Sequence, residues 1–254
     1  MSTEDLIVTR TDGVLHLRLN RPSKRNAITV SMYAAMADAL GAAETDGTLV
    51  VIFSGEGAGF CAGNDLADFV ANRPSAEEAA NAPVQRFLLG IASSSRIMIA
   101  AVHGKAIGVG TTMLLHCDFV VAEQGAELRM PFTDLALVPE AASSLLVPAL
   151  VGHQRAAALL ILGDALSAEQ ALAIGLVNQV VPAGGGVAAA EALAARVLAK
   201  PRSAVLATKR LMRSAVVDVP GRMAQENAAF GAQLETPELA AIVAGFFAAR
   251  HKAA

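Results

Sequence analysis

Glu140 is the acidic residue whose surroundings in the sequence most suggest chemistry. It lies in LVPEAASSLL, Leu137 to Leu146, between a proline and a run of small residues that is expected to begin a helix. An acid in the first helical turn is common, because the carboxylate meets the positive end of the helix dipole. A carboxylate beside a substrate can instead act as a general base. This stretch alone is compatible with both roles.

Two loops of small residues can present backbone N–H groups to a ligand. The first loop, Phe53 to Leu66, is FSGEGAGFCAGNDL, and the second loop, His103 to Met113, is HGKAIGVGTTM. Each loop follows a continuous apolar run, which is typical of a buried strand. Free N–H groups at the start of a helix stabilise a developing negative charge. The two loops together suggest an oxyanion hole with two donors.

The first loop also has two other interpretations. Gly57, Gly59 and Ala62 fit the loose dinucleotide-binding pattern, which requires an acid at the end of the next strand. The candidate acids, Glu77 and Glu78, do not stand at a strand end. The remaining alternative is a tight connection that binds nothing.

Other candidate side chains favour structural roles. His103 and His116 lie in apolar segments, where histidines are more often packed and hydrogen-bonded than catalytic. Cys61 has no evident base partner, and Cys117 and Cys61 are expected to be free thiols. The sequence has no GxSxG, CxxC or HExxH pattern, so we expect neither a serine hydrolase triad nor a metal site.

The elements that must position these residues form a predicted α/β fold with largely buried sheets. Buried strands are expected at Thr48–Gly55, Ile97–Gly104 and Asp118–Gln124. Alternation of apolar and polar residues predicts a half-buried strand at Val14–Asn20. Helices are expected at residues 31–44 and 110–116. We expect a core at residues 1–200 and a helical C-terminal region at residues 201–254, whose last helices, at 221–234 and 237–249, have apolar faces that must dock on something.

Composition excludes several classes of partner. The net charge is −3 without a basic cluster, so no nucleic acid is expected. Hydrophobic residues make up 54% of the chain, more apolar surface than one monomer is expected to bury, which indicates an oligomer. The most apolar stretch, Ile97–Ala122, contains Lys105, which makes a membrane span unfavourable. The acidic start lacks the apolar segment of a signal peptide, so a cytoplasmic protein is expected.

Six segments match a known family in order and spacing. They are LNRPSKRNAIT (Leu19–Thr29), SGEGAGFCAGNDL (Ser54–Leu66), IAAVHGKAIGVGTTMLLHCDFVVA (Ile99–Ala122), LRMPFTDLALVPEAASS (Leu128–Ser144), GLVNQVV (Gly175–Val181) and AGFFAAR (Ala244–Arg250). With them the chain resembles the enoyl-CoA hydratase/isomerase (crotonase) superfamily. The resemblance implies a spiral of ββα units and a C-terminal helical region that mediates trimers or dimers of trimers. It also implies an acyl-CoA thioester substrate and no cofactor besides the coenzyme A of that substrate.

The resemblance also implies roles for residues of both loops. The oxyanion donors are expected to be the backbone N–H groups of Ala62 and Val109, and Val109 replaces the family's middle glycine. The segment Ala67–Gly90 is expected to cover the acyl chain. Substrate and CoA contacts are expected at Lys24, Ala27, Ala62, Gly63, Asn64, Asp65, Leu66, Gly108 and Val109.

Departures from the hydratase pattern favour an isomerase. The two hydratase glutamates are replaced by Thr112 and Phe132, whereas Pro139–Glu140–Ala141 resembles the catalytic segment of the peroxisomal type of Δ3-Δ2-enoyl-CoA isomerase. One carboxylate can move a proton from C2 to C4. The expected function is therefore a Δ3-to-Δ2 double-bond shift through a thioester enolate in fatty-acid β-oxidation. The alternatives are a hydratase or other crotonase chemistry, and an acyl-CoA-binding protein without catalysis.

Overall fold

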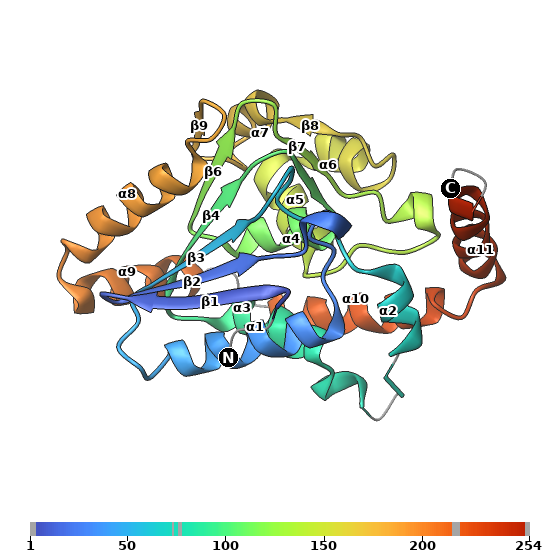
Figure 1. Ribbon diagram of the computed structural model, residues 1–254, viewed down its shortest axis with the longest axis horizontal. Helices are drawn as coiled ribbons and strands as arrows, with labels where there is room; N and C mark the ends of the chain where they lie inside the picture. Colours follow the sequence, from blue (N-terminus) through green and yellow to red (C-terminus); the bar gives the residue numbers. More distant parts are fainter. Residues whose placement is uncertain (1–3, 73, 76–77, 215–218, 252–254) are drawn as a thin grey trace.

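The larger of two sheets runs through the centre of the molecule (Figure 1). The computed structural model describes residues 4–72, 74–75, 78–214 and 219–251. The sheet has the order β1 (Leu6–Thr11), β2 (Val14–Leu19), β3 (Val50–Gly55), β4 (Ile97–Val102), β6 (Phe119–Glu123) and β9 (Gln179–Val181). Only the β1–β2 pair is antiparallel among these described strands, and the other neighbours are parallel.

The smaller sheet receives the chain after β4 and again after β6. Its order is β5 (Lys105–Ile107), β7 (Glu127–Arg129) and β8 (Leu166–Ser167). The chain passes from β4 to β5 and later from β6 to β7, so consecutive strands belong to different sheets. This repeated crossing places the second loop, which contains β5, beside the strand β7.

The central strands are buried on both faces, as their continuous apolar runs predict. All six residues of β4 are buried, and the alternate residues of β3 point into two different clusters. Helices α1 (Val30–Ala43) and α3 (Pro83–Ser93) cover one face. There the ring of Phe53 on β3 packs edge-on against the ring of Phe87, with 6.4 Å between the ring centres. Helix α8 (Gly186–Leu198) packs against the other face with Ala190 and Ala194.

Further helices of the core are shorter. They are α2 (Leu66–Ala71), α4 (Val109–Thr112), α5 (Ser143–Val151), α6 (His153–Leu160) and α7 (Ala168–Ala173). The helix expected at residues 110–116 is split into α4 and a 3-10 turn, Met113–His116. Within the described ranges, no helix is both long and apolar enough to cross a membrane.

The C-terminal region consists of α9 (Arg202–Ser214), α10 (Val219–Gln233) and α11 (Pro237–His251). The last two helices begin and end within two residues of the expected bounds. Helix α9 is fixed to the core by Lys209, which donates to the Asp118 carboxylate at 2.6 Å and to the carbonyl of Arg96. Helix α10 passes beneath α3 and reaches α2, while α11 stands at the edge of the molecule (Figure 1). The division at residue 200 stays a prediction.

Candidate active site

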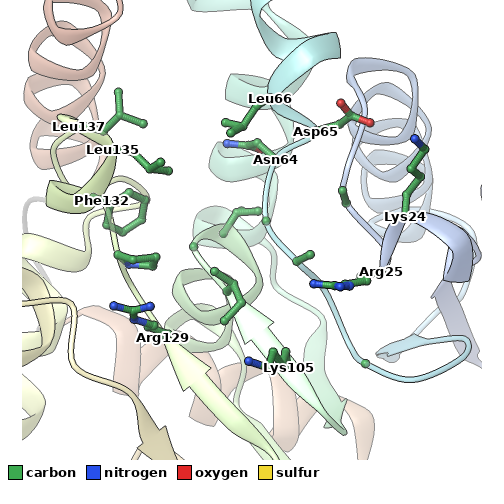
Figure 2. A pocket seen from close by; sticks show the side chains of 18 of the residues that line it. Lys24, Arg25, Asn64, Asp65, Leu66, Lys105, Arg129, Phe132, Leu135 and Leu137 are labelled. Atoms are coloured by element: carbon green, nitrogen blue, oxygen red, sulfur yellow. The ribbon is translucent and has the colours of Figure 1, made fainter. Parts of the chain in front are cut away.

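A cavity of about 1050 Å³ lies between the two loops and the segment that follows β7. Every residue predicted to contact substrate or CoA lines it, and so does Glu140. Figure 2 shows the lining: Phe132, Leu135 and Leu137 stand on one side, and Asn64 and Leu66 face them from the first loop. Of the predicted acyl cover, residues 73, 76 and 77 lie outside the described residues, and Ala67 of α2 lines the cavity.

Backbone hydrogen bonds join the two loops side by side. Cys61 N–H donates to the carbonyl of Lys105 at 3.0 Å, and Ile107 N–H donates to the carbonyl of Cys61 at 2.8 Å. Gly110 is required here, since a Cβ atom at this position would lie 2.8 Å from both Cβ and the carbonyl oxygen of Cys61. The first loop is also held by the buried side chain of Asn26, whose amide donates to Glu56 and Gly59 carbonyls at 2.8 Å each.

The hydrogen bonds of the first loop correct one predicted oxyanion donor. Ala62 N–H already donates to the carbonyl of Arg25 at 3.0 Å, so it is not available to a substrate oxygen. Gly63 and Asp65 both bond to Ile28, so the N–H of Asn64 between them faces the opposite side. In the parts of the chain that the structure describes, neither Asn64 N–H nor Val109 N–H has a hydrogen-bond acceptor.

Val109 is the first residue of α4, where a backbone N–H has no partner within the helix. Its side chain is buried, so the replacement of glycine by valine does not prevent the N–H from reaching the cavity wall. Val109 and Asn64 thus carry the unengaged backbone N–H groups at the cavity, where the sequence predicted donors at Val109 and Ala62. The sequence could not reveal this shift of two residues, because it depends on which way each N–H points.

Glu140 does not belong to a helix. Helix α5 begins at Ser143, with Ala142 as its N-cap and no acidic residue in its first turn, so the interpretation of Glu140 as a first-turn acid is wrong. The Glu140 side chain is 4% exposed and lines the cavity. Its main-chain carbonyl accepts from the Ser143 hydroxyl at 2.6 Å.

The electrostatics place the Glu140 carboxylate close to the first loop. Burial raises the pKa of Tyr33, and the Glu140 charge acts in the same direction. Burial likewise raises the pKa of the Cys61 thiol to about 12, with a smaller contribution from Glu140. The thiol is therefore protonated at neutral pH, in line with the expectation that Cys61 is not a nucleophile. Tyr33 donates its hydroxyl to Asn64 Oδ1 at 2.5 Å and so fixes that side chain.

The residues that replace the hydratase glutamates have different positions. Phe132 is 5% exposed and lines the cavity. Thr112 is fully buried and is not among the lining residues, and among the described residues its hydroxyl has no hydrogen-bond partner. The end of the cavity with Phe132 is apolar and is completed by Phe230 of α10. The ring of Phe230 packs edge-on against the ring of Phe69, with 5.8 Å between the ring centres.

Four cationic side chains also line the cavity, Lys24, Arg25, Lys105 and Arg129. Figure 2 shows Lys24 and Arg25 across the cavity from Phe132, whereas Arg129 lies on the same side as Phe132. Lys105 pairs with Glu127 at 3.2 Å and Arg129 with Asp134 at 2.9 Å. Lys24 and Arg25 form no ion pair within the described portion of the chain, so their charges are the ones available to an anionic ligand.

Asp65 has structural partners as well as a place in the cavity wall. It accepts from Arg21 at 3.1 Å and caps α2 by accepting from Asp68 N–H at 3.2 Å. Although burial acts in the opposite direction, these bonds hold the pKa of Asp65 below its usual value. His103 is hydrogen-bonded to the carbonyl of Gly57 and His116 to that of Ala141, as expected for structural histidines.

The sequence analysis missed Tyr33, Arg129 and Phe230. Arg129 had a local signal, because it ends a short strand immediately before Pro131–Phe132. Tyr33 and Phe230 had none, since they reach the site only through tertiary packing of α1 and α10. Across the described residues, no group of three or more His, Cys, Asp or Glu side chains could hold a metal ion.

The chain was compared with known families, sequences and structures. A family model described as enoyl-CoA hydratase/isomerase matches residues 9–246. The chain is 37% identical over 183 residues to enoyl-CoA delta isomerase 2 of Rattus norvegicus, covering 71% of this chain and 47% of that protein. It is 34% identical to enoyl-CoA delta isomerase 3, peroxisomal, of Mus musculus, covering 71% and 58%. The chain thus spans about half the length of these curated relatives.

Similarity to a solved structure extends over the whole fold. The structure of Pseudomonas aeruginosa OdaA superimposes with a TM-score of 0.92 at 40% sequence identity. The match covers 96% of this chain and 99% of that one. Both loops, the segment around Glu140 and the C-terminal helices therefore lie within the shared architecture.

Proposed function

Because the chain belongs to the enoyl-CoA hydratase/isomerase family, we propose that it is an enzyme that moves the double bond of an acyl-CoA thioester from Δ3 to Δ2. The fold class expected from the sequence, a crotonase-like α/β spiral with a helical C-terminal region, is confirmed by the match. The activity rests on one observation above all. The buried Glu140 shares a cavity with two unengaged backbone donors, and Phe132 lines the wall in place of a second carboxylate.

The reaction uses the two N–H groups and the glutamate in sequence. The thioester oxygen accepts hydrogen bonds from Asn64 N–H and Val109 N–H. Glu140 removes a proton from C2, and the electrons of that C–H bond form an enolate whose charge rests on the thioester oxygen. Glu140 then returns the proton to C4, which leaves the double bond between C2 and C3. Each donor is expected to lower the barrier by about 3 kcal/mol.

Phe132 favours isomerisation over hydration. Hydration requires water over C3 together with a group that activates it, whereas the phenyl ring of Phe132 offers neither a base nor a hydrogen-bond donor. The buried hydroxyl of Thr112 does not line the cavity. A second carboxylate that acts as a general acid or base typically raises the reaction rate by a factor of about 10² to 10⁴. Its absence is therefore expected to slow hydration by that factor.

Lys24 and Arg25 suit the phosphates of coenzyme A, because both line the cavity and both are free of ion pairs with other described residues. The apolar wall with Phe132, Leu135 and Leu137 suits the acyl chain. Asn64 and Val109 line the same cavity, and in this proposal the thioester binds at their N–H groups.

A direct test supplies 3-enoyl-CoA and 2-enoyl-CoA separately to the purified protein. Mass spectrometry and absorbance then follow 2-enoyl-CoA and 3-hydroxyacyl-CoA. We expect isomerisation to exceed hydration by roughly two orders of magnitude or more. Equal rates of isomerisation and hydration would contradict the isomerase proposal and favour the alternative, a hydratase. Tight binding of the esters without turnover, unchanged in Glu140→Gln, would select the non-catalytic alternative.

Assembly, location and pathway extend this proposal. A trimer or dimer of trimers is expected from the apolar excess of the chain. Multi-angle light scattering at micromolar concentration tests it, and a stable monomer would contradict it. A cytoplasmic location and a role in fatty-acid β-oxidation stay predictions from the sequence.

A further inference from the structure

Two successive alanines after Glu140 adopt a conformation that alanine disfavours. Ala141 has φ of 55° and Ala142 has φ of 58°, both in the left-handed region. Non-glycine residues rarely adopt this conformation, because Cβ then approaches the backbone too closely. Two in succession persist only where surrounding contacts impose them. The turn that carries Glu140 is therefore held in place by its neighbours.

Buried hydrogen bonds help to hold this turn. Ser143 binds the carbonyl of Glu140 through its N–H at 3.0 Å and its hydroxyl at 2.6 Å. A further contact comes from a distant segment: His116 Nε2 lies 2.8 Å from the carbonyl oxygen of Ala141. His116 is 4% exposed and Ala141 1%, so water does not replace this bond easily.

The protonation of His116 fits the role of a neutral donor. Burial lowers the pKa of His116 to about 4, and the positive charges of Arg213 and Lys209 on α9 act in the same direction. The ring is therefore neutral at pH 7, and a carbonyl partner can only accept, so the proton resides on Nε2. The main chain of His116 is fixed as well, since Arg213 donates to its carbonyl at 2.6 Å.

We propose that His116 is a positioning residue for Glu140: its Nε2–H holds the Ala141 carbonyl and thereby keeps the strained turn, and the Glu140 carboxylate, directed into the cavity. The role connects α9 to the site, because Arg213 anchors the His116 backbone from the C-terminal region. This inference rests on the proposed function, in which Glu140 is the base. It adds a residue that lies outside the cavity wall and never contacts substrate.

The test compares two amide variants that differ in reach. Gln at position 116 can present an amide N–H near the place of Nε2, whereas Asn is too short to reach the Ala141 carbonyl. We expect His116→Asn to lower kcat roughly 100-fold, the effect of a small displacement of a catalytic group. The KM should change by less than about twofold, because substrate binding does not depend on the base. His116→Gln should stay within about fivefold of the wild-type kcat.

A second substitution tests the strain itself. Glycine adopts positive φ without penalty. The double variant His116→Asn with Ala141→Gly should therefore have a kcat about tenfold higher than that of His116→Asn alone. Cys117→Ala is the matched control, since Cys117 is a partly buried neighbour of His116 whose thiol faces the carbonyl of Met113. This control should keep the wild-type kcat, and the kcat of His116→Gln keeps the test informative if His116→Asn alone does not fold.

The outcomes separate this inference from the proposed function. Equal kcat values in His116→Asn and His116→Gln, or a parallel loss in Cys117→Ala, would overturn the positioning role. Absence of any recovery with Ala141→Gly in a folded protein would do the same. If Glu140→Gln is inactive while His116→Asn is fully active, only the positioning role fails. If Glu140→Gln keeps its activity, the proposed base is wrong and the role of His116 fails with it.

Discussion

At the scale of single residues, the site depends on three groups that belong to different segments. Glu140 comes from a turn before α5, Val109 from the start of α4 and Asn64 from the first loop. Two of them are proposed to act through backbone N–H groups, a role that does not constrain their side chains. In this proposal valine can replace the family's glycine at position 109 without loss of a donor.

Glu140→Gln tests the proposed base. Glutamine keeps the size and polarity of the side chain and removes only its basicity. We expect kcat for 3-enoyl-CoA to fall by about 10² to 10⁴, while binding of a CoA ester, measured by isothermal titration calorimetry, is nearly unchanged. A variant that retains more than a few per cent of the activity would show that another group removes the proton.

Val109→Pro tests a backbone donor without touching the glutamate. Proline is accepted at the first helical position and lacks the N–H, so α4 can persist while the donor is lost. We expect kcat to fall by about 10² to 10³, as measured by steady-state kinetics. Val109→Ala is the control, because it shortens the side chain but keeps the N–H. Similar losses in both variants would assign the effect to packing instead.

At the scale of elements, the C-terminal helix α10 contributes to the cavity. Phe230 is 9% exposed, lines the apolar end and packs edge-on against Phe69 of α2. Helices α2 and α10 are far apart in the sequence, so this end of the cavity exists only when the C-terminal region is docked. The fit of the acyl chain thus depends on the packing of α10 as well as on the core.

Phe230→Ala should enlarge the apolar end. Removal of the ring leaves space for longer or branched acyl chains, and one methylene of fit is typically worth about 1–3 kcal/mol in specificity. We expect the kcat/KM ratio of long over short 3-enoyl-CoA esters to rise by roughly tenfold, measured across a chain-length series. Val70→Ala, on the exposed side of α2, is the control and should leave the ratio unchanged. An unchanged ratio in Phe230→Ala would exclude Phe230 from the acyl end.

At the scale of the whole molecule, buried polar groups tie the helical region to the core. His116, Asp118 and the carbonyl of Arg96 all meet side chains of α9, either Arg213 or Lys209. Burial, with a smaller contribution from the charges of Arg213 and Lys209 on the docked α9, lowers the pKa of His116 and keeps its ring neutral. The stability of the protein should for this reason depend on pH.

The unfolding free energy should decrease as the pH falls from about 6.5 to about 4. The unfolded chain takes up a proton at His116 near pH 6.5, whereas the folded protein does so only near pH 4. The unfolded state binds more protons in this window, so stability is lost as pH falls, by up to about 3 kcal/mol. Urea unfolding from pH 4 to 7.5 measures it. His116→Gln lacks this titration, so its unfolding free energy should decrease less over the same pH range. If the unfolding free energies of the wild type and His116→Gln depend on pH in parallel, the assignment to His116 is contradicted.

The sequence by itself determined the strands, the loops and the candidate base. The apolar runs that become β3 and β4 are long enough to require burial on both faces, and no other arrangement satisfies them. The motifs of both loops and the segment around Glu140 are local, so they could be matched in order to a family. All residues predicted to contact the substrate line one cavity for the same reason.

Only the tertiary structure decided which groups complete the site. The direction of each N–H depends on the partner of the neighbouring segment, so Ala62 is engaged by Arg25 and the donor becomes Asn64. The strained turn at Ala141 and Ala142, held by His116 and Ser143, delays the start of the helix to Ser143, so Glu140 precedes the helix and does not lie in its first turn. Tyr33 and Phe230 enter through packing of distant helices. Each of these depends on contacts between segments far apart in the chain, which local patterns do not encode.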